Sequence, residues 1–153
     1  MSDKRISAQA IIEAPPAVVF AIIADPRQHS RIDGSGSVQD LASGPQQLDR
    51  GATFDVRMRL FGVPYTISNR VVEFEQDKQI AWRHFGGHRW RYELEPSGAG
   101  GTRVTETFDY SRYGTVASGV IRGAGFPERN RRGIEATLVR LKAAAEQDAA
   151  ASQ

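Results

Sequence analysis

Apolar and polar residues alternate along several short stretches of the chain, which is the pattern of half-buried β-strands. The first stretch runs from Ile6 to Ile12, and the clearest runs from Thr53 to Leu60, with alternate residues apolar. Weaker strand signals cover Ser37 to Leu41, Tyr65 to Glu75, Gln79 to Phe85, Arg89 to Glu95 and Thr102 to Tyr110. In one of these stretches Val71 and Val72 interrupt the alternation, which indicates a β-bulge and leaves its inner face open.

Three segments carry helical signals instead. Pro15-Pro16 opens a short helix that Asp25-Pro26 ends, and a second helical turn is predicted to reach Ile32. A turn is also expected within Val116 to Ala124. From Pro127 onward, apolar residues recur at helical spacing: Ile134, Leu138, Leu141 and Ala145. The pattern predicts an α+β fold, with an antiparallel sheet of about six to seven strands and a long C-terminal helix.

The loop between two of the predicted strands, with the sequence Gly-Gly-His, decides which side chains share a face. A two-residue loop would set Arg83 opposite Trp90. A three-residue loop sets His84 opposite Trp90 and Trp82 opposite Tyr92, which gathers the aromatic residues on one face. We therefore favour the three-residue loop, although it sets two arginines opposite each other on the outer face.

Length and composition point to one soluble domain. The chain has 153 residues, of which 40% are hydrophobic and 25% charged, and it contains no cysteine. We expect a single domain over residues 1–153, with residues 1–4 and 148–153 frayed. No apolar run is long enough for a signal peptide or membrane span, so we expect a cytoplasmic protein without an integral membrane segment.

The charge pattern and the motifs exclude several function classes. The net charge is only +2, and many arginines alternate with apolar residues or lie beside acids, so no nucleic-acid partner is expected. The three histidines lack the spacing of a metal site, and neither a phosphate-binding glycine loop nor a nucleophile elbow is present. We expect no metal and no cofactor. A monomer and a homodimer both remain open.

Several stretches resemble a known superfamily. They are Ala14-Pro15-Pro16-Ala17-Val18-Val19-Phe20, Ala24-Asp25-Pro26, Ile80-Ala81-Trp82 and Gly101-Thr102-Arg103-Val104-Thr105-Glu106-Thr107. With the order of elements, they are similar to the helix-grip or START-like (SRPBCC) superfamily, and in particular to its bacterial polyketide cyclase/dehydrase-type members. The resemblance implies a curved sheet wrapped around the C-terminal helix, two short helices after the first strand, and a cavity between sheet and helix.

The alternation along the strands and the spacing along the helix then predict which residues line that cavity. From the sheet and the helix, the predicted ligand-binding residues are Met58, Trp82, His84, Trp90, Tyr92, Glu106, Phe108, Tyr110, Asn130, Ile134, Leu138 and Leu141. A mostly apolar lining with a few polar groups is typical of a small-molecule site. For these aromatic residues the alternative is plain core packing. Asp33 lies in a Gly/Ser loop, which favours a turn role over a place at the entrance.

Three residues are candidates for proton transfer: His84, Glu106 and Tyr110. The alternative is a structural role, with the histidine satisfied by a neighbour and the glutamate paired with an arginine. Our leading hypothesis is therefore a protein that binds an apolar or aromatic small molecule, polyketide-like or lipid-like. The alternatives are an enzyme of the cyclase or dehydratase kind, which uses these groups as acid and base, and a protein-interaction module.

Overall fold

The computed structural model describes residues 5–36, 38–83, 88–98, 100–111 and 126–151. The helical turn expected within Val116 to Ala124 lies outside the described residues. The elements are, in chain order, β1 (Arg5–Ile12), α1 (Pro16–Ile23), the 3-10 helix η1 (Pro26–Gln28), α2 (His29–Ile32), β2 (Val38–Ser43), β3 (Thr53–Leu60), β4 (Val63–Glu75), β5 (Gln79–Arg83), β6 (Arg89–Ser97), β7 (Gly101–Asp109) and α4 (Phe126–Ala151).

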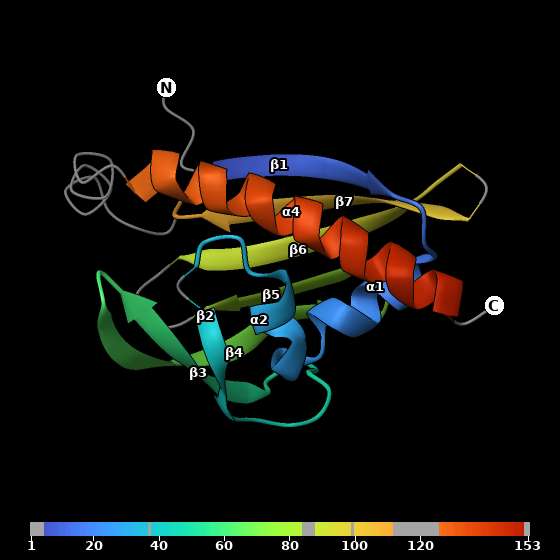
Figure 1. Ribbon diagram of the computed structural model, residues 1–153. Helices are drawn as coiled ribbons and strands as arrows, with labels where there is room; N and C mark the ends of the chain where they lie inside the picture. Colours follow the sequence, from blue (N-terminus) through green and yellow to red (C-terminus); the bar gives the residue numbers. More distant parts are fainter. Residues whose placement is uncertain (1–4, 37, 84–87, 99, 112–125, 152–153) are drawn as a thin grey trace.

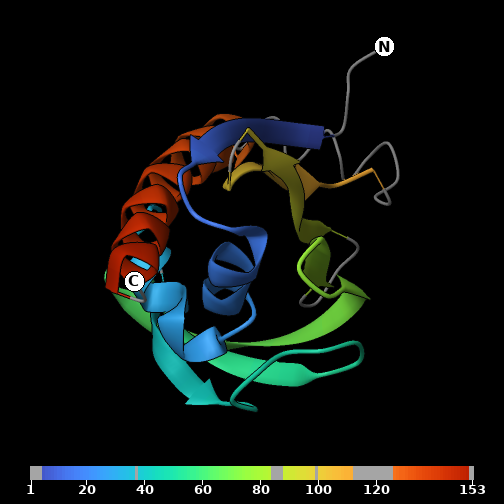
Figure 2. The same cartoon turned by 90° about the vertical axis from the view of Figure 1, so that its right-hand side faces the viewer.

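The strands form one antiparallel sheet of seven strands in the order β1-β7-β6-β5-β4-β3-β2. Strands β1 and β2 lie at opposite edges of the sheet, and the connection between them runs through α1, η1 and α2 (Figure 1). Seen along the sheet, the strands curve around α1, and α4 packs along β1 and also contacts α1 and α2 (Figure 2). The predicted α+β helix-grip fold is confirmed.

Helix α1 fills one end of the concave face of the sheet. Pro16 occupies its first turn, where a missing backbone N–H costs nothing, and Pro26 begins the next helical turn as predicted. The ring of Phe20 meets Phe74 of β4 edge-on, with ring centroids 5.7 Å apart. The residues of α1 that are buried are Val19, Phe20, Ile22 and Ile23. This end of the molecule is therefore solid hydrophobic core.

A β-bulge in β4 sets which residues face inward, and it lies where the Val-Val pair predicted it. Val71 pairs with Trp82 and Glu73 pairs with Ala81, so that Val72 is the extra residue. Before the bulge, the buried residues of β4 are Ile67, Asn69 and Val71. After it, Phe74 points inward and Glu73 lies on the outer face, because one extra residue shifts the alternation.

The three-residue loop predicted between β5 and β6 is wrong. Trp82 pairs with Trp90, not with Tyr92, and β6 begins only at Arg89. A shift of two residues leaves every side chain on its predicted face, so parity could not detect it. The observed register sets Ala81 opposite Arg91, so Arg83 and Arg91 do not face each other; Arg83 instead lies opposite Arg70 of β4. Residues 84–87, which include His84, lie outside the described residues.

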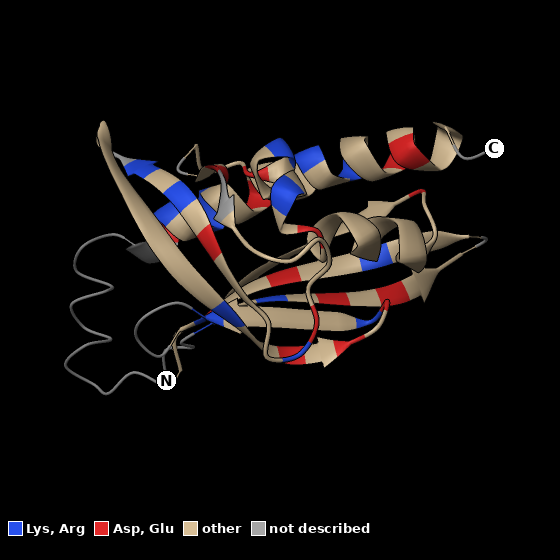
Figure 3. Cartoon of the chain, turned by 90° about the horizontal axis from the view of Figure 1, so that it is seen from below, with Lys and Arg blue, Asp and Glu red and all other residues tan. Residues whose placement is uncertain are grey.

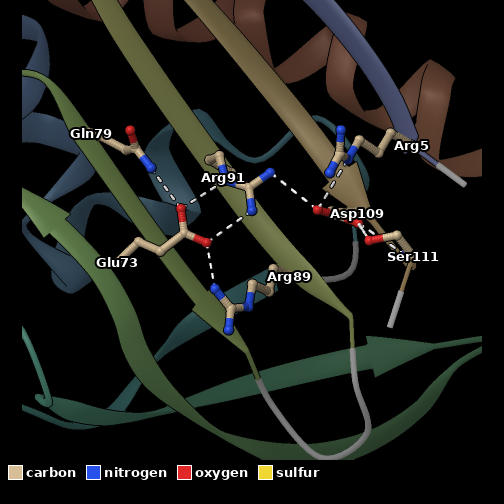
Figure 4. Close-up of polar contacts among 7 residues, drawn as sticks. All are labelled: Arg5, Glu73, Gln79, Arg89, Arg91, Asp109 and Ser111. Atoms are coloured by element: carbon tan, nitrogen blue, oxygen red, sulfur yellow. Dashed lines mark hydrogen bonds and ion pairs between the residues drawn. The ribbon is translucent and has the colours of Figure 1, made fainter. Parts of the chain in front are cut away.

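On the outer face of the sheet, charged side chains form a network across five strands (Figure 4). The Glu73 carboxylate accepts hydrogen bonds from Gln79 at 2.6 Å, from Arg89 at 2.5 Å and from Arg91 at 2.8 and 2.9 Å. Arg91 also donates to Asp109 at 3.2 Å. Asp109 in turn accepts hydrogen bonds from Arg5 and from Ser111. The network ties β4 to β1 through β5, β6 and β7.

Glu73 is the centre of this network. The Arg91 guanidinium lowers the pKa of Glu73 from its usual 4.5 to about 2, against the opposing effect of partial burial, and Arg89 and Gln79 add to the lowering. A lowered pKa in the folded state means that the ionised carboxylate stabilises the fold. That contribution is complete above pH 4.5 and disappears as the pH falls toward about 2.

At the opposite side of the molecule, the loop after α2 touches α4 closely. A Cβ atom on Gly34 would lie 2.4 Å from both the Ala136 Cβ and the Thr137 backbone nitrogen. The Gly34 N–H donates to the Thr137 hydroxyl at 2.9 Å, and Arg140 donates to the Asp33 carbonyl at 2.9 Å. Only glycine allows this approach, which fixes α2 and its loop against α4.

The last turns of α4 are also anchored. Arg31 of α2 pairs with Asp148 at 2.8 Å. Helix α4 continues through Ala151, and fraying of residues 148–153 stays a prediction. The ion pair and the half-buried Ala149, which packs against the core, hold these turns against the rest of the fold.

Replacing Glu73 tests the outer-face network. Glu73→Gln should lower the free energy of unfolding at pH 7 by about 1–3 kcal/mol, because charge-assisted hydrogen bonds to two arginines are lost. Urea unfolding at several pH values should show this difference shrinking below pH 4.5. The control is Glu75→Gln on the same strand, whose contact is an exposed pair with Lys78, and which should have little effect. A constant difference down to pH 2 would contradict the role of the ionised carboxylate.

Two glycines, one on each side of the contact between α4 and the loop after α2, test how close this contact is. Gly34→Ala should lower the free energy of unfolding by about 1–3 kcal/mol, because the new methyl group meets helix backbone. Gly133→Ala is the matched control: its Cβ would meet the Ser35 Cβ at an ordinary 3.5 Å. Since alanine favours helix, we expect stability to be unchanged or raised by up to about 1 kcal/mol. Equal effects in thermal unfolding would refute the proposed close contact.

Candidate functional site

A large cavity lies at the end of the concave face that α1 does not fill. Its volume is about 1390 Å³. Strands β2 to β7 supply the sheet wall, while α2 with its following loop and the first half of α4 supply the other. At the rim, the close contact of Gly34 holds this loop against α4.

Aromatic side chains pack against one another along the sheet wall. The Trp82 ring stacks on His29 with centroids 4.8 Å apart and an interplanar angle of 20°. Phe54 meets Trp82 edge-on at 5.6 Å. Further along, Trp90 lies 4.8 Å from Phe108. These rings form a rigid apolar surface on which a planar or aliphatic molecule can lie.

His29 belongs to this surface as a neutral ring. Its Nε2 lies 2.8 Å from the carbonyl oxygen of Ile23 and donates to it. Burial lowers the pKa of His29, and the Ile23 carbonyl and nearby Asp25 and Asp33 only partly oppose this effect. In the sequence, His29 was considered only as a metal ligand, because its place in the short α2 gave no indication that it would reach Trp82.

Glu106 is the central polar group of the cavity. It lies on the inner face of β7, opposite Tyr92 on β6, and is only 3% exposed. Its Oε1 has no hydrogen-bond partner among the described residues. Burial raises the pKa of Glu106 well above its usual 4.5, the Tyr92 hydroxyl acts in the opposite direction, and the charge of Asp33 raises it further. Burial therefore favours the protonated, neutral form of the carboxyl group, which can donate a hydrogen bond into the cavity.

Other polar groups of the lining are fewer and weaker. Burial raises the pKa of Tyr92 well above 10, with the charge of Glu106 acting in the same direction, so the phenol stays protonated. His88 lies against Phe108 at 5.2 Å, and burial lowers its pKa to about 4. The Asn69 side chain donates to the Ile67 carbonyl in a long contact of 3.4 Å. The cavity is thus apolar, with neutral donors at a few points.

Most of the residues predicted to form the walls do line the cavity. They are Met58, Trp82, Trp90, Tyr92, Glu106, Phe108, Asn130 and Ile134. Whether they contact a ligand stays a prediction. The position of His84 cannot be compared, since it lies outside the described residues.

Three of the predicted wall residues do not line the cavity. Tyr110 is buried and stacks on Phe108 at 5.6 Å, behind the wall. Leu138 and Leu141 lie in the hydrophobic core, because α1 fills the space that the second half of α4 faces. Asp33 lines the cavity and also closes a turn, since its carboxylate accepts hydrogen bonds from the backbone of residues 35, 36 and 38.

Several lining residues were missed. Phe54 and Val56 had been predicted on an inner face but not assigned to the cavity, and Asn69 lies on the strand whose inner face was left open. Residues around the mouth gave no signal: Arg59 is one of the polar residues that alternate with the apolar set of β3, and the others come from a turn and from the first turns of α4, namely Phe61, Arg129 and Arg132. Tertiary contact, and not alternation, brings them together.

Two further observations concern the part of the chain that the structure describes. It contains no group of three or more histidine, cysteine, aspartate or glutamate side chains that could hold a metal ion. Among the helices described, none has the length and apolar character needed to cross a membrane.

Comparisons with known proteins agree with the fold. The family described as polyketide cyclase / dehydrase and lipid transport matches residues 3–146. The uncharacterized protein Rv0088 of Mycobacterium tuberculosis is 44% identical over 139 residues. The match covers 90% of this chain but only 62% of Rv0088, so the chain spans less than two thirds of that relative's length.

Two crystal structures share the architecture at low sequence identity. Protein NE0264 from Nitrosomonas europaea superposes with a TM-score of 0.71 and 17% identity, over 98% of this chain and 99% of that one. Protein CV1439 from Chromobacterium violaceum gives a TM-score of 0.72 and 20% identity, over 93% and 97% of the two chains. These structures show that the fold is shared.

Glu106 offers a test of the cavity's electrostatics. A raised pKa in the folded state means that stability is lost as the pH rises from 4.5 toward the folded value. Glu106→Gln removes the titration, so the variant should match the wild type near pH 4 and be more stable by about 1–3 kcal/mol at pH 7. The control is Glu93→Gln on the exposed outer face of β6, with no expected pH-dependent difference. Denaturant unfolding in which Glu106→Gln is destabilised at pH 7 would refute the neutral acid.

Proposed function

Because this chain belongs to the polyketide cyclase / dehydrase and lipid transport family, we propose that its cavity binds an apolar or aromatic small molecule, polyketide-like or lipid-like. The volume of about 1390 Å³ is enough for a ligand larger than an ordinary drug-sized molecule. The stacked rings of Trp82 and His29 supply a flat apolar surface for it. The geometry therefore favours a bulky, mostly apolar guest.

The unpartnered oxygen of Glu106 is the observation that carries this proposal. A buried polar atom without a partner lowers stability, and such atoms are rare in folded proteins. A ligand carbonyl or hydroxyl oxygen near Glu106 would accept a hydrogen bond from the neutral acid. The guest is thus expected to have an oxygen atom within its apolar body, as polyketides and many lipids do.

Two fluorescent dyes separate this hydrogen bond from simple apolar binding. Prodan is a naphthyl ketone, whereas N-phenylnaphthylamine has no carbonyl group. Both should bind and quench the fluorescence of Trp82 and Trp90. Glu106→Leu should weaken prodan about three- to tenfold, as expected for the loss of one hydrogen bond, and leave N-phenylnaphthylamine unchanged. Glu106→Gln, which keeps a neutral donor, is the control and should retain prodan.

If neither dye binds, and native mass spectrometry of the purified protein shows no small molecule carried along, the cavity is not a ligand site. Equal loss of both dyes in Glu106→Leu would mean that the substitution disturbs the cavity as a whole. In that case Glu106 has no specific role in recognition.

Acid catalysis is a second candidate function, and the raised pKa of Glu106 favours it specifically. In the cyclisation of a poly-β-ketone, the neutral carboxyl group would donate its proton to the ketone oxygen as the attacking carbon forms the new C–C bond, and the resulting carboxylate would recover a proton from that attacking carbon. In the dehydration that follows, the carboxyl group would protonate the new hydroxyl, the C–O bond would break to release water, and the carboxylate would take a proton from the adjacent carbon as the C=C bond forms.

Turnover distinguishes the enzyme from the binding protein. A synthetic poly-β-keto thioester would be incubated with the chain, and its products separated by chromatography. If Glu106 is the acid, Glu106→Gln should bind the thioester as well as the wild type does but lower turnover by a factor of about 100 or more. Unchanged product profiles with and without the wild-type protein would leave binding as the function.

A further inference from the structure

The charged residues of the cavity are distributed unequally between its interior and its mouth. Inside, burial raises the pKa of Glu106 and so favours its neutral form. At the rim, the Asp33 carboxylate accepts hydrogen bonds from backbone N–H groups of its own turn and keeps its one negative charge. The remaining charged lining residues are all arginines: Arg59, Arg129 and Arg132. The mouth is therefore positively charged, and the interior is not.

These three arginines come from two elements far apart in sequence. Arg59 lies near the end of β3, and Arg129 and Arg132 lie in the first turns of α4. Figure 3 shows basic positions on both elements. One acid, Glu128, lies 4.0 Å from Arg132, and both side chains are largely exposed. An exposed pair at that distance neutralises little of the local charge.

The hairpin turn between β3 and β4 brings an aromatic ring to the same place. Phe61 and Gly62 have φ angles of 51° and 79°, as in the two-residue turns that favour asparagine and glycine. A phenylalanine is unfavourable in this conformation, and its side chain is 82% exposed. It lines the cavity, and the Arg129 guanidinium lies 5.0 Å from its ring centre. A strained, exposed aromatic residue that holds an arginine at a cavity mouth points to a function there.

We propose that the ligand carries an anionic group at one end of its apolar body, and that Arg59, Arg129 and Arg132 bind this group at the mouth. The inference rests on the proposed function, since it assigns one end of the same guest. A carboxylate and a phosphate would both fit the planar guanidinium groups. The apolar body lies on the aromatic surface, and the charged end stays where solvent and arginines meet it.

Two dyes with the same aromatic body test the charge of the ligand. Anilinonaphthalene sulfonate carries an anionic group that N-phenylnaphthylamine lacks. Arg129→Gln/Arg132→Gln should weaken the sulfonate about three- to tenfold, since each exposed ion pair contributes a factor of about 1.5 to 5. The same variant should bind the neutral dye as the wild type does. Arg131→Gln is the matched control, because Arg131 is exposed on the same turn of α4 but does not line the cavity, and it should change neither dye.

Salt and competitors complete the experiment. In about 1 M salt, where charges are screened beyond roughly 3 Å, the wild type should bind the sulfonate only as well as the double variant does. Dodecanoate and dodecyl phosphate should both displace N-phenylnaphthylamine at lower concentration than dodecanol does. The more effective of the two anions then identifies the charged group as carboxylate or phosphate.

The outcomes separate this inference from the proposed function. If both dyes bind and the double variant weakens neither, or weakens both equally, the anionic group is refuted while the cavity remains a binding site. If neither dye binds, the proposed function fails as well. If the double variant loses only binding to phosphatidylglycerol vesicles, the arginines contact a membrane surface and the inference is wrong.

Discussion

The concave face of the sheet is larger than the helices can cover, and the site depends on this mismatch. Seven strands curve around α1, which together with the second half of α4 fills one end with buried aliphatic side chains. Over the other end, the first half of α4 and the loop after α2 form the cavity wall that faces the sheet. Because interiors are otherwise packed densely, a space of this size has to be held open by rigid contacts.

Two sets of contacts stabilise different parts of the molecule. The outer-face network around Glu73 ties the central strands to β1, while the close approach of Gly34 to α4 fixes the cavity wall that faces the sheet. Neither lies on the aromatic surface around Trp82. The buried acid has the opposite effect on stability, because the unpartnered Oε1 of Glu106 opposes folding. A buried group that opposes folding is explained by a role in recognition and not by one in stability.

Much of the fold could be predicted from the sequence, because alternation and helix signals depend on local residues. The strand Thr53 to Leu60, the bulge at Val71 and Val72, and the inward face of Trp82, Trp90 and Tyr92 all followed from parity. The register of β5 with β6 did not, since a shift by two residues preserves every face. Leu138 and Leu141 were misplaced for a related reason: helical spacing predicts that they face inward but not that α1 lies there.

The cavity's polar chemistry was harder to predict than its apolar walls. Glu106 was identified because it interrupts an apolar alternation. His29, Asn69 and the arginines of the mouth were not. His29 lies in a helix of four residues that is too short to show a period, Asn69 lies on the strand whose inner face was left open, and the arginines lie near the end of β3 and in the first turns of α4. The location of such residues depends on contacts between elements, and these became visible only in three dimensions.

The extra residue at Val72 has one more consequence. It splits β4 into a part before the bulge, whose inward residues Ile67 and Asn69 line the cavity, and a part after it, whose Phe74 packs on α1 and whose Glu73 holds the network. Residues that line the cavity and residues that stabilise the sheet therefore lie on separate parts of one strand. Substitutions in the first part can reshape the cavity while the second part keeps the strand in place.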